Sequence, residues 1–185
     1  MDDLERTTDD PRPRASDSDS PGEAFHLLFV CTGNTCRSPL AELLARRGLA
    51  ERGWDHVEVR SSGVAATKGA PASRGSVRAG DRHGLELRGH RATPLEPAMV
   101  EWADLILTMS PSHLDGVAIL GGEHKVSVIT DFVREAEAGT SSAVVRSRGV
   151  SDPIGGDDSD YEDTFRQLEA LIQKVLARLE PLVSP

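Results

Sequence analysis

The chain has 185 residues, of which 38% are hydrophobic and 28% charged, so it can bury the core of one domain. Its net charge of −9 argues against nucleic acid or an anionic membrane surface as the main partner. It has two cysteines and no apolar run long enough to cross a membrane, so we expect no disulfide framework and a reducing, cytoplasmic location.

Residues 1–24 differ in composition from the rest of the chain. They hold eight acidic and three basic residues, are rich in Pro, Ser and Asp, and offer almost nothing to bury. Such a segment is typical of a disordered acidic tail, and its polar start is unlike a signal peptide. We therefore expect one folded domain over residues 25–183.

From residue 25 onward, short apolar segments alternate with segments of helical periodicity. Strands are predicted over residues 25–30, 57–63, 103–109 and 125–129. Helices are predicted over 40–49, in a modest segment ending near 84, over 95–102 and from about 159 to 181. This alternation predicts an α/β fold, a doubly wound sandwich with a central four-stranded parallel sheet flanked by helices. Ligands bind at the carboxyl ends of the strands in such folds.

The last helix has recognisable start and stop signals. Ser159 and Glu162 are spaced as a capping box, and Pro181 is expected to end the helix. Its apolar residues recur on one face, as expected of a core helix. Before it lies a polar stretch, residues 137–151, which we expect to form a long loop.

The loop after the first strand carries the clearest chemical signal. Gly33 and Asn34 tolerate a positive φ, so neighbouring backbone N–H groups can turn inward as an anion-binding nest. The helix that follows adds the positive end of its dipole, and the guanidinium of Arg37 matches a pair of phosphate oxygens. A thiol placed over such a cradle, here Cys31, is favoured as a thiolate nucleophile. The loop therefore suits attack on phosphorus.

Residues 30–42, VCTGNTCRSPLAE, resemble the signature loop of the low-molecular-weight protein phosphatases, and the similarity extends over about 25–182. The resemblance implies a hydrolase in which Cys31 forms a phosphocysteine and Arg37 stabilises the transferred phosphoryl group. It also implies that Asp152, in an Asp-Pro pair before the last helix, is the general acid and base. The implied phosphate-binding residues are Thr32, Gly33, Asn34, Thr35, Cys36, Arg37 and Ser38.

The resemblance assigns supporting roles to further residues. Ser38 is expected to hydrogen-bond the thiolate, and it could also cap the helix. Asn34 is expected to hold the loop in shape, braced by Ser61 and by His90, the one histidine that we place near the site. For Cys36 two interpretations stay open, a protective disulfide with Cys31 under oxidation or a small buried filler.

No metal site or cofactor is expected. None of the six histidines lies near a cysteine or another histidine at the spacing of metal ligands. The expected partner is a phosphorylated protein, and the enzyme is expected to act as a monomer.

The substrate side chain is less clearly indicated. Tyrosine-directed members often have Ile at the place of Thr35, whereas the branch similar to bacterial protein-arginine phosphatases has Thr there. A hydroxyl can accept an N–H of a guanidinium or position water, which a methyl group cannot. Many tyrosine-directed members have an aromatic residue at the place of Ile154 to stack on the phenol ring, so Ile154 slightly favours phosphoarginine, although arginine-directed relatives commonly have an aromatic residue there too. We favour phosphoarginine as the substrate, with phosphotyrosine as the alternative.

Two functions of other classes remain as alternatives. An arsenate reductase on this fold needs a further downstream cysteine pair, and no cysteine follows Cys36. A non-catalytic phospho-binding module would be expected to lack Cys31, Arg37 or Asp152, and all three are present. Both alternatives are therefore less favoured than a phosphatase.

Overall fold

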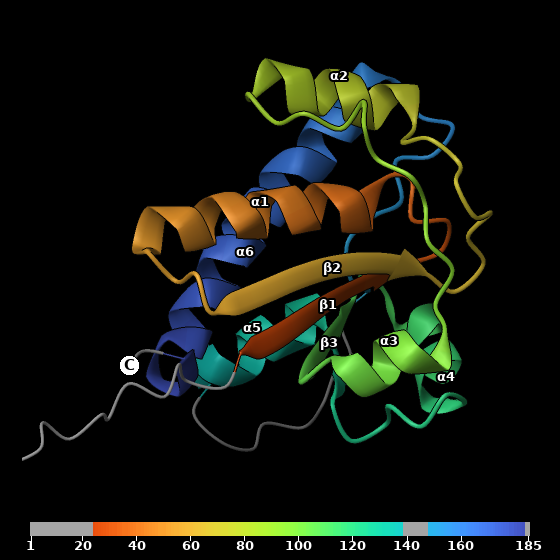
Figure 1. The fold of residues 1–185 in the computed structure, drawn as a ribbon. Coiled ribbons are helices and arrows are strands. Elements are labelled where there is room, and N and C mark those ends of the chain that lie inside the picture. The colour runs from red at the N-terminus through yellow and green to blue at the C-terminus, as the bar shows by residue number, and fades with distance from the viewer. Residues whose placement is uncertain (1–23, 139–147, 184–185) are drawn as a thin grey trace, which may run out of the picture.

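The computed structural model describes residues 24–138 and 148–183. Its centre is a sheet of four parallel strands in the order β2-β1-β3-β4 (Figure 1). The strands are β1 (Phe25–Cys31), β2 (Val57–Gly63), β3 (Leu105–Thr108) and β4 (Val126–Val128). The predicted four-stranded parallel sheet is confirmed. The predicted tail (1–24) falls outside the described residues except for its last residue, as does most of the predicted 137–151 loop.

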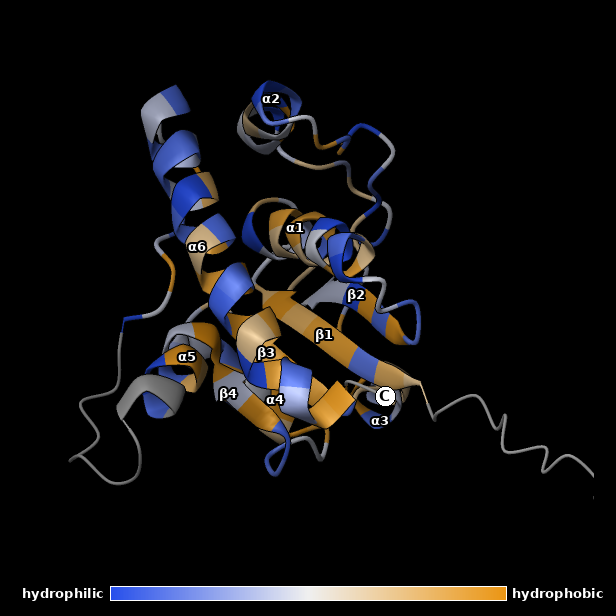
Figure 2. Ribbon diagram, turned by 90° about the vertical axis from the view of Figure 1, so that its left-hand side faces the viewer, coloured by the Kyte–Doolittle hydropathy of each residue, from blue (hydrophilic) through white to orange (hydrophobic). Residues whose placement is uncertain are grey.

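Helices cover both faces of the sheet. They are α1 (Arg37–Arg52), α2 (Arg74–Arg82), α3 (Pro97–Trp102), η1 (Pro111–His113), α4 (Leu114–Ala118), α5 (Ile129–Ala138) and α6 (Asp158–Val183). Alternate residues of β1 point to opposite faces, as the pleat of a strand requires. Leu27 and Phe29 pack in one core cluster with residues of α1, α5 and α6, whereas Leu28 and Val30 pack in a second cluster with residues of α3 and α4 (Figures 1 and 2).

The strand order places one end of the sheet in position to bind a ligand. From β1 the chain moves to β2 on one side, and then to β3 on the other side of β1. Loops leaving the carboxyl ends of β1 and β3 diverge at such a switch point, which leaves a crevice between them. Cys31, the last residue of β1, stands at this end, as the sequence predicted.

Three helical elements, η1, α4 and α5, were not predicted, and the last two strands were predicted too long. Residues 125–129 were read as one strand, but β4 ends at Val128 and Ile129 is already the first residue of α5. Ile129 is fully buried. An apolar run cannot by itself distinguish the end of a buried strand from the start of a buried helix, which explains the error.

The predicted capping box at the start of α6 is wrong. The helix begins at Asp158, and the carboxylate of Asp157 accepts the backbone N–H groups of Ser159 (2.8 Å) and Asp160 (3.3 Å). An aspartate is as good an N-cap as a serine, so the cap lies two residues earlier. Glu162 instead hydrogen-bonds His83, which follows α2.

The predicted end of α6 at Pro181 is also wrong, because the helix continues through this residue to Val183. The side chain of Val183 is buried in the main core cluster together with Leu179. This packing of the last turn accounts for a helix that extends past its proline.

Gly63 allows the end of β2 to approach the loop that follows β1. A Cβ atom at this position would lie 2.5 Å from the carbonyl oxygen of Thr32 and 2.8 Å from the backbone nitrogen of Asn34. Both are backbone atoms, which cannot rotate away as a side chain can. A side chain at position 63 would therefore have to displace the loop itself.

We predict that Gly63→Ala lowers the free energy of unfolding by about 1–3 kcal/mol, the usual cost of overpacking. Urea denaturation measures this change. The matched control is Gly89→Ala, because a Cβ at Gly89 meets no atom within 4 Å. Equal stability of the two variants would contradict the close approach at Gly63.

Candidate active site

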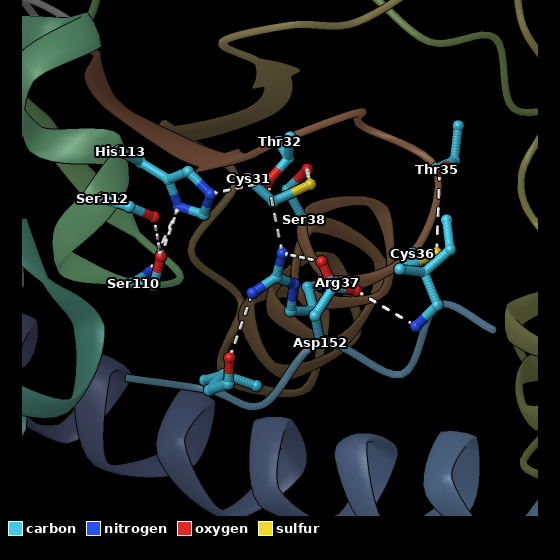
Figure 3. Close-up of polar contacts among 12 residues, drawn as sticks. Cys31, Thr32, Thr35, Cys36, Arg37, Ser38, Ser110, Ser112, His113 and Asp152 are labelled. Carbon is cyan, nitrogen blue, oxygen red and sulfur yellow. Dashed lines mark hydrogen bonds and ion pairs between the residues drawn. The ribbon is translucent and has the colours of Figure 1, made fainter. Parts of the chain in front are cut away.

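The loop between β1 and α1 encloses the sulfur of Cys31 with hydrogen-bonding groups. The backbone N–H of Asn34 donates to this sulfur at 3.3 Å, and the hydroxyl oxygen of Ser38 lies 3.0 Å from it (Figure 3). The predicted contact of Ser38 is therefore present, but the predicted cap is not. Cys36 occupies the N-cap position of α1, which leaves the Ser38 side chain directed at the sulfur.

Asn34 fixes the shape of this loop. Its φ of 52° is the only positive value at a non-glycine residue among those described. Its side-chain Nδ2 donates to the hydroxyls of Ser38 and Ser61, both at 2.9 Å, and its Oδ1 accepts the backbone N–H of Thr93 at 2.8 Å. The Nε2 atom of His90 lies 2.7 Å from its carbonyl oxygen. The predicted bracing by Ser61 and His90 is thus seen in the structure.

Arg37 lies buried beside the thiol, with 4% of its surface exposed. Its Nη1 donates to the carbonyl of Val150 at 3.1 Å, and its Nη2 donates to Oδ2 of Asp152 at 2.5 Å. Its Nε, also buried, has no hydrogen-bond partner within the described part of the chain. A buried guanidinium with an unpaired N–H is suited to bind an anion that enters the site.

The predicted catalytic residues line one pocket of about 140 Å³. Its lining residues are Cys31, Thr32, Gly33, Thr35, Cys36, Arg37, Asp152 and Ile154. Asp152 is partly exposed, and its Oδ1 accepts the backbone N–H of Ile154 at 3.2 Å. Both cysteines of the pocket are buried free thiols. A nucleophile, a cation and a carboxylate from distant parts of the sequence therefore meet in one small space.

His113 also lies at the site, although His90 was the one histidine predicted there. His113 is 2% exposed, and its Nε2 lies 2.9 Å from the hydroxyl oxygen of Thr32. Burial, reinforced by the positive charge of Arg37, lowers the pKa of His113 from 6.5 to about 4, although Asp152 opposes the shift. The ring is therefore neutral at neutral pH. The one available signal was its position shortly after β3, at the same edge of the sheet.

Within residues 24–138 and 148–183, no three His, Cys, Asp or Glu side chains are grouped so that they could hold a metal ion. Among the helices of the same ranges, none has the length and apolar character needed to cross a membrane.

Residues 26–183 match the family model described as low molecular weight phosphotyrosine protein phosphatase. The chain belongs to this family. The match includes the loop between β1 and α1, Asp152, and all of the sheet except Phe25.

Individual relatives agree with this assignment. The chain is 36% identical to a protein-arginine-phosphatase of Bacillus subtilis over 154 residues, which cover 83% of this chain and 96% of that protein. It is 30% identical to the low molecular weight protein-tyrosine-phosphatase PtpB of Staphylococcus epidermidis, over 80% of this chain and 95% of that one.

A solved structure extends the comparison to the site. It is a mutant of the arginine phosphatase YwlE with a phosphorylated active-site serine. This structure superposes with a TM-score of 0.74 at 32% identity, and it covers 84% of this chain and 96% of that one. In that protein, the mutated active-site residue itself carries the phosphoryl group. This is the arrangement expected of a family that uses a covalent phosphoenzyme.

The neutral state of His113 predicts a pH dependence of stability. The native ring takes up a proton only near pH 4, whereas the ring in the unfolded chain does so near pH 6.5. Between these values the unfolded state binds more protons, so the free energy of unfolding decreases as the pH falls from 6.5 to 4. In His113→Asn this contribution is absent. Urea denaturation at pH 7 and pH 4.5 should therefore show a smaller loss of stability in the variant than in the wild type.

An equal or larger loss in His113→Asn would contradict a neutral buried ring at this position. His124→Asn is the matched control, because this side chain is exposed on the surface. Its substitution should leave the difference in stability between the two pH values unchanged.

Proposed function

We propose that the protein removes phosphoryl groups from phosphorylated protein side chains, with Cys31 as the nucleophile and a phosphocysteine as the intermediate. One observation carries this proposal: the sulfur of Cys31 shares a small pocket with a buried Arg37 whose Nε has no hydrogen-bond partner among the residues that the structure describes. The pocket also contains a carboxylate, that of Asp152, within reach of this guanidinium. A phosphate held there would meet the nucleophile, the anion-binding group and a proton donor together.

In the first step the sulfur of Cys31 attacks phosphorus, and the bond between phosphorus and the leaving atom breaks. Asp152, in its protonated form, delivers the proton that the leaving oxygen or nitrogen needs. Arg37 and the amides of the loop stabilise the three non-bridging oxygens, on which negative charge is spread in the transition state. These donors are already fixed before the reaction, so no reorganisation is required of them.

In the second step water attacks the phosphocysteine, and the bond between phosphorus and sulfur breaks. Asp152 now accepts a proton from this water. The hydroxyl of Ser38, 3.0 Å from the sulfur, can donate a hydrogen bond to the departing thiolate. Asn34 also donates a hydrogen bond to the hydroxyl of Ser38. One hydroxyl therefore contacts both the residue that shapes the loop and the sulfur that departs in this step.

The ion pair between Arg37 and Asp152 connects substrate binding to acid catalysis. A phosphoryl group bound in the loop competes with the Asp152 carboxylate for the same Nη2 atom. Its arrival therefore weakens the hold of Arg37 on Asp152, whose carboxyl can then turn to the leaving atom. Asp152 is partly exposed, which leaves room for this movement.

Phosphoarginine is the substrate that we favour. Thr35 lines the pocket, where its hydroxyl can accept an N–H of the substrate guanidinium or position water. Ile154, 65% exposed at the rim, does not offer an aromatic face to a phenol ring. The named activity of the Bacillus subtilis relative agrees with this choice. Phosphotyrosine is the second candidate, since the Staphylococcus epidermidis relative is named for it.

We predict that Asp152→Ala slows the first step by roughly 10²–10⁴-fold for substrates with poor leaving groups, because general acid catalysis typically contributes this much. An activated aryl phosphate, whose leaving group needs little protonation, should be slowed much less. Rapid-quench measurement of leaving-group release on both substrates tests this difference. Asp163→Ala on the exposed face of α6 is the control. Equal slowing of both substrates would exclude Asp152 as the acid.

The substrate class is tested by kcat/KM on a phosphoarginine protein and a phosphotyrosine peptide, for wild type and Thr35→Ile. We expect the wild type to prefer phosphoarginine and the variant to lose or reverse this preference. A hydrogen bond to a buried charged group is worth about 1.5–3 kcal/mol, so the change should be roughly tenfold or more. A wild-type preference for phosphotyrosine that the variant does not alter would contradict our assignment of Thr35.

A further inference from the structure

The hydroxyl of Thr32 lies on the pocket wall between two hydrogen-bond donors. Its Oγ1 is 2.9 Å from Nε2 of His113 and 3.5 Å from Nη2 of Arg37, and Figure 3 shows dashed lines running from Thr32 to both residues. A hydroxyl has two acceptor lone pairs and one hydrogen. If both neighbours donate, both lone pairs are occupied and the hydrogen of Thr32 remains to be donated.

The surroundings of the His113 ring settle which of its nitrogens carries the hydrogen. The other ring nitrogen, Nδ1, lies 3.2 Å from the backbone nitrogen of Ser110, which can only donate. Nδ1 is therefore the acceptor, and in a neutral ring the hydrogen must reside on Nε2. The N–H at Nε2 therefore donates to the hydroxyl oxygen of Thr32, where it occupies one of the two lone pairs.

The local fold holds this ring in a single orientation. Ser110 is the N-cap residue of η1 (Pro111–His113), the short turn that follows β3. His113 is the third residue of η1, and its side chain accepts the backbone N–H of Ser110. The hydroxyl of Ser110 is also 3.3 Å from Nδ1. Because the ring is buried and bound at both nitrogens, it cannot flip without losing both contacts.

We propose that the hydroxyl of Thr32 is a further donor to the phosphoryl oxygens, aimed into the pocket by His113. This inference rests on the proposed phosphatase function and adds a side-chain donor to the backbone cradle. Thr32 would contact the substrate, whereas His113 acts through Thr32 as a positioning residue. Arg37 and Thr32 approach the same space, so the hydroxyl hydrogen is directed where negative charge increases in the transition state.

Four single variants and one double variant separate these roles. Thr32→Val removes the hydroxyl at constant shape, and Thr32→Ser keeps it. In His113→Asn the shorter amide can still accept the N–H of Ser110 but cannot reach Thr32. In His113→Gln the longer amide can still donate to Thr32. The double variant combines Thr32→Val with His113→Asn.

The readouts are kcat/KM on p-nitrophenyl phosphate and competitive inhibition by inorganic phosphate. We expect Thr32→Val to lower kcat/KM by roughly 10- to 100-fold, as for the loss of a hydrogen bond to a charged group, and to weaken phosphate binding. Thr32→Ser should retain most of the activity. His113→Asn should lower kcat/KM, whereas His113→Gln should largely retain it. In the Thr32→Val background, His113→Asn should cause no further loss of kcat/KM, because His113 acts through the hydroxyl that is already missing.

A kcat/KM of Thr32→Val equal to that of the wild type would overturn the proposal. A double variant whose loss of kcat/KM equals the product of the two single losses would also overturn it. If Thr32→Val does not fold, as judged by urea denaturation, Thr32→Ala makes the same comparison. Failure of the proposed function would look different, since the wild type would then hydrolyse no phosphorylated substrate. Direct binding of inorganic phosphate then decides: weaker binding by Thr32→Val supports the Thr32 donor, and unchanged binding refutes it.

Discussion

The structure of the site depends on one backbone turn, the left-handed conformation of Asn34. A residue with a side chain adopts this conformation at a cost in free energy, which its surroundings must offset. Here the side-chain amide and the carbonyl of Asn34 are hydrogen-bonded to four other residues, from α1, β2 and the segment before α3. The turn directs the N–H of Asn34 at the sulfur of Cys31. Gly63 makes it possible, because its missing side chain leaves space for this loop.

Three segments that are far apart in the sequence meet around this turn because of the strand order. Cys31 and Arg37 stand at the two ends of the loop that joins β1 to α1. The turn after β3 supplies His113, and the segment before α6 supplies Asp152. The ion pair of Arg37 with Asp152 spans 115 positions of the chain. Parallel strands bring their carboxyl ends to one edge of the sheet, so groups from separate βα units converge there.

The sequence and its family resemblance were sufficient to predict the sheet, the loop and most of the residues that line the pocket. Cys31 and Arg37 lie in one short segment whose spacing and strand–loop–helix context are specific. Asp152 was assigned through the family resemblance, because an Asp-Pro pair by itself is usually only a turn. His113 could not be predicted, because its role arises from a tertiary contact with Thr32. The helix start at Asp158 was missed for a local reason, because several neighbouring acidic and hydroxyl residues can cap a helix equally well. Glu162 is instead engaged by His83, which follows α2.

The central claim is that the reaction passes through a phosphate ester of the Cys31 thiol. The most direct measurement is mass spectrometry of the enzyme after rapid quenching during turnover of an aryl phosphate, with proteolysis to locate the modification. We predict the added mass of one phosphoryl group on Cys31 and not on Cys36, with no modification and no turnover in Cys31→Ala. Turnover by Cys31→Ala, or a phosphoryl group located on any other residue, would contradict this account of the site.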